Sequence, residues 1–284
     1  MKRNLKILSA EAPDPIHVIS LGGGTQSSAM LLMADAGLLT PKPDYAIFAD
    51  TLGETQTVYD WLDWLRANVK SIPIVTVSEG DLMKAARTIY TSKGGREYTR
   101  RLIPYFTKSE NGKIGRAQTR GCTHDFKIVP IRRYMRKQAN LRYGENRLRV
   151  IQWLGITVDE AARMRDSNAP WLGHRYPLIE IGMTRQDCID WVQANFQRIP
   201  PRSSCFFCPF HSADYWRDLK LFERKSFNDA ITFERQLQAS TERLASHSAI
   251  PYLTRRCKPL DQAVDEMIDE RSKFQEECSG HCGV

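Results

Sequence analysis

A glycine-rich turn near the start of the chain has the composition of a phosphate-binding loop. Residues 20–28 read Ser-Leu-Gly-Gly-Gly-Thr-Gln-Ser-Ser and include the end of an apolar run. Glycines let a backbone turn tightly and present its N–H groups to an anion, and a helix N-terminus adds the positive end of its dipole. Many strand–helix connections use glycine for geometry alone, but the serine pair adds two hydroxyl donors. The sequence therefore predicts nucleotide binding by Ser20, Gly22, Gly23, Gly24, Gln26, Ser27 and Ser28.

The cysteines are the second group of residues suited to chemistry. Their number, seven, is odd, and the first residues lack the apolar core of a secretory signal. We therefore expect a cytoplasmic protein with metal, cluster or thiol chemistry rather than a disulfide framework. The segment Cys205-Phe-Phe-Cys208 is a turn that can chelate zinc, bind an iron–sulfur cluster or form a redox disulfide. Cys122 provides a third thiol.

The C-terminal tail carries a candidate nucleophile. It reads Glu-Glu-Cys278-Ser-Gly-His281-Cys282, so a thiol stands three residues before a histidine. A nearby imidazolium favours the reactive thiolate, which makes Cys278 and His281 candidate catalytic residues. A frayed terminus with incidental thiols is the alternative.

The charge of the chain is suited to a polyanionic partner. The net charge is +8, from 41 Lys and Arg against 33 acids, and basic residues are frequent between residues 87 and 149. Such a field fits a nucleotide phosphate or a nucleic acid, although a solvated surface with counter-ions elsewhere has the same composition. The longest apolar stretch, residues 29–39, is shorter than the ~20 residues that span a bilayer, so we expect no membrane partner.

Short apolar runs alternate with helical patterns along the first part of the chain. This alternation predicts an α/β fold with a doubly wound parallel sheet, and a helical C-terminal extension follows. The predicted strands are 17–21, 44–49, 72–77 and 149–154, and the predicted helices are 27–39, 57–69, 131–139, 158–165, 184–195, 213–245 and 259–277. Residues 91–121 lack periodicity and are predicted to form a long loop that acts as a lid. We expect a nucleotide-binding α/β domain at 1–210 and the extension, with its cysteine tail, at 211–284.

The glycine turn resembles the phosphate loop of the PP-loop (adenine nucleotide alpha hydrolase-like) superfamily, whose pattern is Ser-Gly-Gly-x-Asp-Ser. Gly22 replaces the leading Ser and Gln26 replaces the Asp, which counts against cleavage of ATP. Residues 48–54 resemble the Asp-Thr-Gly segment, with Asp50 placed to hold a ribose hydroxyl or a metal-bound water, or to cap the strand. Residues 153–163 resemble the Gly-Ile-x-x-x-Glu-x-x-x-Arg stretch, which implies nucleotide contacts by Gly155, Glu160 and Arg163; the last two could instead pair with each other.

The cysteine segments are similar to those of the phosphoadenosine phosphosulfate (PAPS) reductase-like family. Residues 121–130 resemble its Cys-Cys-x-x-Arg-Lys-Val-x-Pro segment, with Thr123 in place of the second Cys. The resemblance implies a 4Fe–4S cluster held by Cys122, Cys205 and Cys208, with Cys282 as a candidate fourth ligand or as a thiol that resolves a Cys278 disulfide. Structural zinc and unligated thiols remain alternatives. The tail resembles the family's Glu-Cys-Gly-x-His, in which the cysteine attacks sulfate sulfur.

Three functions follow from these features. The first is a PAPS reductase-like enzyme that acts on adenylyl sulfate, with basic residues 96–120 closing over the anion and a thioredoxin-like thiol reductant releasing sulfite. The second is an ATP-dependent sulfurtransferase, with Mg²⁺ as a candidate cofactor, that takes sulfur from a donor and thiolates or phosphorothioates a nucleic acid. The third is a non-catalytic, zinc-stabilised nucleic-acid-binding protein.

Overall fold

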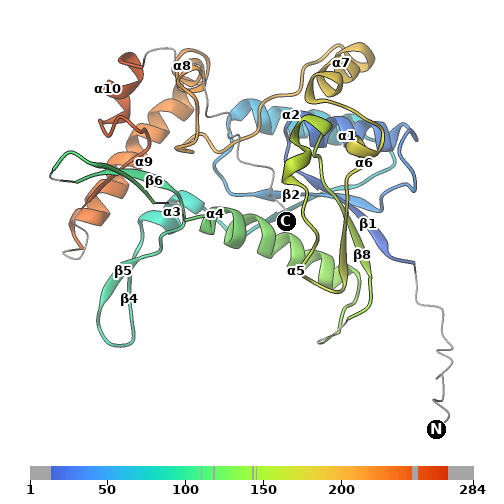
Figure 1. Cartoon of the computed structure of the whole chain (residues 1–284), viewed down its shortest axis with the longest axis horizontal. Helices are drawn as coiled ribbons and strands as arrows, with labels where there is room; N and C mark the ends of the chain where they lie inside the picture. Colours follow the sequence, from blue (N-terminus) through green and yellow to red (C-terminus); the bar gives the residue numbers. More distant parts are fainter. Residues whose placement is uncertain are drawn as a thin grey trace, which may run out of the picture.

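The computed structural model describes residues 14–109, 111–117, 119–142, 144, 146–244 and 249–267. One half of the molecule is a five-stranded, all-parallel sheet with helices on both faces, and the other half combines small antiparallel sheets with helices (Figure 1). The strand order of the large sheet is β3-β2-β1-β8-β9. Its strands are β1 (Ile16–Leu21), β2 (Tyr45–Asp50), β3 (Ile74–Ser78), β8 (Val150–Trp153) and β9 (Leu172–Arg175). The predicted α/β class with a parallel central sheet is therefore confirmed.

Alternate residues of the central strands enter two separate cores. Ile19 and Trp153 pack on the face covered by helices α1 and α2, whereas Val18 and Val150 pack on the face covered by α5. Side chains of a strand alternate between faces, so a strand covered on both sides must be apolar at nearly every position. The flanking helices are α1 (Thr25–Asp35), α2 (Gln56–Asn68), α5 (Val129–Gln138), α6 (Pro177–Glu180) and α7 (Arg185–Phe196).

The predicted helix boundaries hold in part. The helix predicted at 184–195 is confirmed as α7, and the hydroxyl of Thr184 caps it by accepting a hydrogen bond from the N–H of Asp187. The stretch 158–163 is a 3-10 helix, η2 (Val158–Arg163), rather than an α-helix. The helix predicted at 131–139 begins earlier, through α4 (Gly121–Thr123) and a π-helical turn, η1 (His124–Ile128). Strand β9 and the short helix α3 (Leu82–Arg87) have no periodic signal, because each spans six residues or fewer.

The prediction of a long loop at 91–121 is wrong. Two β-hairpins occupy this region: β4 (Ile89–Thr91) pairs with β5 (Glu97–Thr99), and β6 (Tyr105–Lys108) pairs with β7 (Ile114–Ala117). Strands of three or four residues are too short to show alternation, and their turns contain Gly95 and Gly112 at positive φ, 78° and 79°. A distant strand, β10 (Ile250–Tyr252), extends the second hairpin into a three-stranded sheet.

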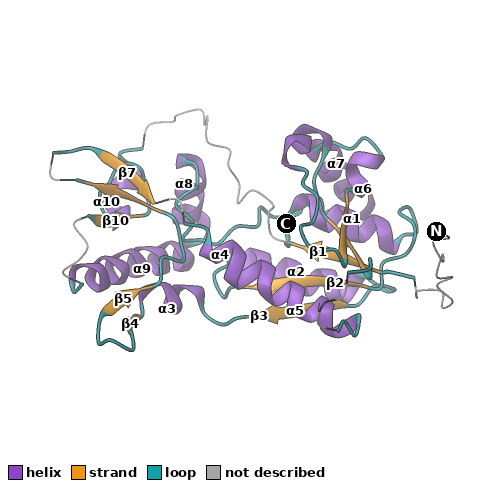
Figure 2. Ribbon diagram, turned by 60° about the horizontal axis from the view of Figure 1, so that its bottom comes forward, coloured by secondary structure: helices purple, strands orange, loops and turns teal. Residues whose placement is uncertain are grey.

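A second core holds the hairpin half together. Helices α8 (Ala213–Phe222), α9 (Arg224–Glu242) and α10 (Leu260–Asp265) bury Trp216, Phe233 and Leu260, and residues from segments 82–86 and 102–126 join the same cluster. Figure 2 shows α9 between the β4–β5 hairpin and the sheet of β6, β7 and β10. The predicted boundary at residue 210 stays a prediction, since this core draws on both sides of it. Residues 268–277 of the predicted last helix lie outside the described residues.

Candidate functional site

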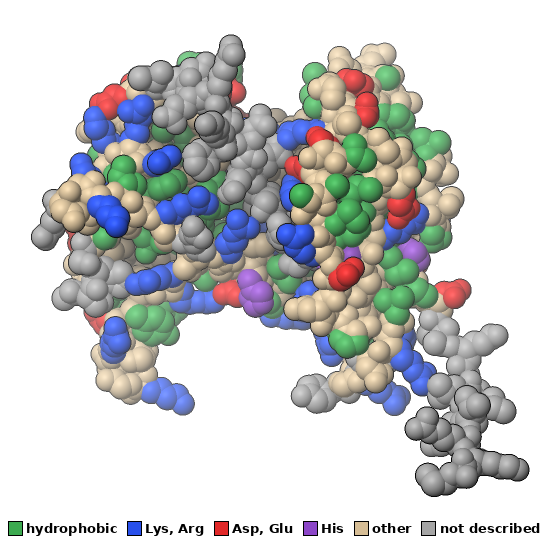
Figure 3. Space-filling view, viewed as in Figure 1, with side chains coloured by type: hydrophobic (Ala, Val, Ile, Leu, Met, Phe, Trp, Pro, Cys, Tyr) green, Lys and Arg blue, Asp and Glu red, His purple; other side chains and the backbone are tan. Residues whose placement is uncertain are grey.

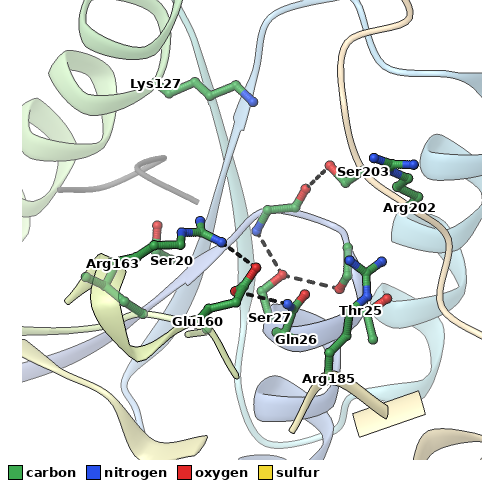
Figure 4. A pocket seen from close by; sticks show the side chains of 14 residues that line it. Ser20, Thr25, Gln26, Ser27, Lys127, Glu160, Arg163, Arg185, Arg202 and Ser203 are labelled. Atoms are coloured by element: carbon green, nitrogen blue, oxygen red, sulfur yellow. Dashed lines mark hydrogen bonds and ion pairs between the residues drawn. The ribbon is translucent and has the colours of Figure 1, made fainter. Parts of the chain in front are cut away.

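The glycine turn lies where the central sheet reverses its winding direction. From β1 the chain crosses through α1 to β2 on one side, while β8 pairs with β1 on the other side. The loops that leave β1 and β8 therefore diverge at their carboxyl ends and leave a crevice, the usual ligand position in an open α/β sheet. A pocket opens there, lined by residues of both loops (Figure 4).

The backbone of the turn is shaped for close approach by a ligand. Gly23 has a φ of 75°, and the Gly22 N–H donates to the Ser27 Oγ at 3.1 Å. Gly24 caps α1 without a side-chain hydrogen bond, so no side chain of the cap competes for the first N–H groups of the helix. A Cβ on Gly155, after β8, would lie 2.9 Å from the Ser27 N, so only glycine fits there. The two loops are thus packed backbone to backbone at the helix N-terminus, which suits a phosphate.

Basic side chains surround this helix end. The lining includes one acid, Glu160, and four cations: Lys127, Arg163, Arg185 and Arg202. The Gln26 Nε2 donates to a Glu160 oxygen at 3.2 Å, and the other Glu160 oxygen pairs with Arg163 at 2.6 Å (Figure 4). The pairing between Glu160 and Arg163 that the sequence allowed is therefore present. The lining as a whole carries more cations than acids, which favours an anionic ligand.

The structure brings eight of the predicted nucleotide-binding residues to the pocket. They are Ser20, Gly22, Gly24, Gln26, Ser27, Gly155, Glu160 and Arg163. Gly23 and Ser28 do not line it: Gly23 shapes the turn, and the fully buried Ser28 accepts a hydrogen bond from the Trp61 indole at 2.9 Å. Asp50 also lies outside the lining, and its Oδ1 accepts from the Leu52 N–H and the Tyr59 hydroxyl at 2.8 and 2.9 Å. These contacts are those of a strand-end cap, the alternative role weighed above.

Sequence reasoning missed several lining residues: Thr25, Lys127, Leu154, Arg185, Arg202 and Ser203. Lys127 stands in the segment 121–130, which carries a family resemblance, so that signal could have found it. Arg202 and Ser203 follow Pro200-Pro201 without any periodic pattern. Conversely, none of the described residues between 96 and 120 lines the pocket, so the predicted basic lid over the nucleotide is absent from this part of the structure.

A buried carboxyl connects the pocket with the cysteine turn. Glu54 is 4% exposed, and one of its oxygens lies 3.8 Å from the Lys127 Nζ. Its carboxylate also accepts from the Ser203 hydroxyl at 3.4 Å and lies 3.9 Å from the Cys205 Sγ. Burial raises the pKa of Glu54, and the charge of Lys127 opposes that rise. The same polar cluster therefore touches the phosphate pocket through Lys127 and Ser203, and the cysteine turn through Cys205.

The Cys-x-x-Cys segment forms a tight turn held by two neighbours. The Cys208 N–H donates to the Cys205 carbonyl at 2.9 Å, and the same carbonyl lies 2.9 Å from the His211 Nε2. Burial lowers the pKa of His211 to about 3, so its neutral ring donates this hydrogen bond. The ring of His211 stacks on Tyr215 with centroids 3.7 Å apart. The turn is thereby fixed against helix α8.

The described residues do not by themselves assemble a metal site. Cys122 and Cys205 pack against the same core cluster, and no disulfide joins any two described cysteines. However, no three His, Cys, Asp or Glu side chains within the described ranges are grouped closely enough to hold an ion. The 4Fe–4S cluster and the zinc alternative therefore remain predictions. Cys278, His281 and Cys282 lie outside the described residues.

Comparisons with known proteins give no further assignment. No known family, no curated protein and no solved structure matches this chain. Among the described helices, none is long and apolar enough to cross a bilayer. We therefore infer the function from the geometry of the site.

Proposed function

We propose that this chain is an enzyme that binds an adenine nucleotide in the pocket between β1 and β8 and carries out thiol-dependent sulfur chemistry, as PAPS reductase-like proteins do. The observation that supports it is the position of the glycine turn. It stands at the point where the sheet changes winding direction, at the start of α1, and four cations line the same pocket. Each of these features favours phosphate, and their coincidence favours a nucleotide.

The lining residues have separate roles in this proposal. The first N–H groups of α1 bind the phosphate or sulfate oxygens, and Arg185 and Arg202 neutralise their charge. Gln26 presents a neutral amide, held by Glu160, where superfamily members that cleave ATP carry an Asp. This difference favours a ready-made adenylyl sulfate over ATP as the substrate.

The sulfur step is assigned to the C-terminal thiol. The Cys278 thiolate attacks the sulfate sulfur, so a sulfur–sulfur bond forms and the bond from sulfur to the nucleotide oxygen breaks, with its electron pair leaving on the nucleotide phosphate. A dithiol reductant such as a thioredoxin then attacks the Cys278 sulfur, supplies two electrons and releases sulfite. Cys122, Cys205, Cys208 and Cys282 remain candidate cluster ligands, and no step is routed through a cluster.

Product analysis tests the proposal. The protein, purified without oxygen, is incubated with adenylyl sulfate and a dithiol, and separately with ATP, and sulfite, AMP and pyrophosphate are measured. The proposal predicts sulfite from adenylyl sulfate, lost in Cys278→Ser and kept in Cys257→Ser. AMP and pyrophosphate from ATP, with no sulfite, would instead support the ATP-dependent sulfurtransferase. Absence of both reactions would overturn the proposed activity.

The metal content is a separate measurement on the same preparations. We expect iron and acid-labile sulfide in the wild-type protein, lost in Cys122→Ser, with Cys188→Ala as the control because Cys188 is fully buried in the sheet core. One zinc per chain, or no metal, would contradict the cluster and leave the nucleotide site to be judged by binding alone.

A further inference from the structure

The net positive charge of the protein is concentrated in residues 87–120, a segment that includes the two hairpins. Residues 87–120 contain nine Lys and Arg and only two acids, a net charge of +7 out of +8 for the whole chain. The remaining residues are nearly balanced, with 32 basic against 31 acidic side chains. A nucleotide-binding function does not use this charge, since no described residue of the segment lines the pocket.

These basic side chains are presented to solvent. Lys93 and Arg96 lie at the turn of the β4–β5 hairpin, Arg101 lies in the connection between hairpins, and Lys108 and Lys113 flank the turn of the second hairpin; all five are exposed. Within the described ranges none of the five forms an ion pair. The same half of the molecule shows many Lys and Arg side chains on its surface, including the projecting β4–β5 hairpin (Figures 1 and 3). A polyanion could therefore neutralise them without breaking existing pairs.

Aromatic residues accompany the charge. The rings of Tyr90 and Tyr98, opposite each other on β4 and β5, have centroids 5.8 Å apart, and Tyr98 is 42% exposed. On the second hairpin the Arg116 guanidinium lies 4.2 Å from the centre of the Phe210 ring. Basic side chains together with an accessible aromatic ring are the combination that binds the backbone and the bases of a single-stranded nucleic acid. The turn 92–96, Ser-Lys-Gly-Gly-Arg, lacks the bulky apolar side chains that insert into a membrane.

The hairpins are fixed to the helix that reaches the pocket. Arg100 pairs with Asp125 at 2.7 Å, and the Cys122 N–H donates to the Leu102 carbonyl at 2.6 Å. The same helical segment carries Lys127 into the pocket lining. A nucleic-acid strand bound along the hairpins would therefore lie on a surface that contacts the helical segment leading to the nucleotide site.

We infer that the two hairpins, residues 89–117, form a docking surface for a single-stranded nucleic acid. Lys93, Arg96, Arg101, Lys108 and Lys113 contact phosphates, and Tyr98 stacks on a base. This surface is distinct from the nucleotide pocket and does not depend on the reaction proposed for it.

Fluorescence anisotropy tests the inference. The full-length protein is titrated into labelled single-stranded RNA, single-stranded DNA and duplex DNA of about 20 nucleotides, over a series of salt concentrations. The variant Lys93→Ala/Arg96→Ala/Arg101→Ala is compared with Lys42→Ala/Lys70→Ala/Lys225→Ala, a matched loss of three exposed charges elsewhere. We expect the hairpin variant to bind single strands about ten- to a hundredfold more weakly near 0.1 M salt and to reduce the log–log salt slope by about 2. The control variant should stay within about twofold of the wild type.

Two results would overturn the inference: no binding of any oligonucleotide by the wild-type protein, or equal losses in the two triple variants. Binding to vesicles with anionic lipid but not to oligonucleotides would assign the surface to a membrane and would also overturn it. Nucleotide affinity is measured on the same variants. Unchanged nucleotide binding together with failed oligonucleotide binding would reject this surface and leave the proposed function intact.

Discussion

The two anion sites that we propose, one in each half of the molecule, are built in different ways. In the sheet half, a few N–H groups and cations converge on a helix end, and the fit is set by backbone packing at Gly24 and Gly155. In the hairpin half, exposed basic side chains are spread over the turns and the connection of two short hairpins, and no described residue of this segment lines the nucleotide pocket. A converging site selects one small ligand, whereas a spread of exposed charge binds long polyanions with a strong dependence on salt. From this difference we expect two ligands whose binding can be abolished separately.

The largest predicted effect is a loss of stability in the hairpin half that leaves nucleotide affinity unchanged. Glu234 on α9 is 1% exposed and accepts hydrogen bonds from the Leu253 and Leu260 N–H groups at 2.8 and 2.7 Å. Glu234→Ala leaves both donors unpaired and should lower the free energy of unfolding by about 3–5 kcal/mol. Leu253 directly follows β10, which pairs with β6, so oligonucleotide binding should weaken as well.

Urea unfolding and both binding assays check this prediction. The control is Asp229→Ala on the same helix, where the lost pair with Lys225 is exposed and should cost at most about 0.5 kcal/mol. Nucleotide affinity should remain within about twofold in folded Glu234→Ala protein. A larger loss of nucleotide than of oligonucleotide affinity would contradict the division between the halves.

The second prediction concerns the close approach of the two pocket loops. A Cβ on Gly155 meets the Ser27 backbone at 2.9 and 3.0 Å, so Gly155→Ala must push apart the loops that carry the phosphate-binding N–H groups. We expect about a hundredfold loss of nucleotide affinity, measured by calorimetry, with oligonucleotide affinity unchanged. Gly94→Ala, in the β4–β5 turn, is the matched control because its Cβ would meet no atom within 4 Å. Equal nucleotide affinities in the two variants would show that the loops are not the site.

Removal of one pocket cation should have a smaller effect. Arg185, the first residue of α7, lines the pocket, and charge-assisted hydrogen bonds contribute about 1.5–3 kcal/mol. Arg185→Ala should therefore weaken nucleotide binding about tenfold or more, while Arg185→Lys retains part of the affinity. The measurement is the same calorimetric titration, with Arg66→Ala as an exposed control outside the pocket. Loss of oligonucleotide binding in Arg185→Ala would instead show that the nucleic-acid surface includes the pocket.

The smallest predicted effect is a pH dependence of stability in the sheet half. The buried Trp153 indole donates to the His17 Nδ1 at 3.0 Å, which requires a neutral ring. Burial and the charge of Arg175 lower the pKa of His17 below its usual 6.5. The neutral His17 therefore makes its full contribution to the free energy of unfolding above pH 6.5. This contribution is lost as the pH falls and amounts to on the order of 0.5 kcal/mol after solvent screening. The urea midpoint should be lower at pH 5.5 than at pH 7.5 in the wild type and in the control His124→Gln. This difference should be smaller in His17→Gln.

Sequence reasoning recovered the parts of this structure that depend on local pattern. The strand, glycine turn and helix around Gly22 are encoded within about twenty neighbouring residues, and the parallel sheet follows from the alternation of such units. The hairpins were missed because strands of three or four residues are too short to show a recognisable alternation. Arg202 and Ser203 were missed for a different reason: they reach the pocket from a segment about 180 residues away, and only the tertiary fold brings them to the turn.

Amide NMR of the full-length protein is the most direct test of the central claim that two anion sites exist on separate halves. An adenine nucleotide is added first, and a single-stranded oligonucleotide second. We expect the nucleotide to shift the N–H signals of residues 22–27 and to leave those of residues 89–117 unchanged. The oligonucleotide should then shift the signals of the hairpins. Nucleotide-induced shifts centred on the hairpins, or no shifts at the glycine turn, would contradict it.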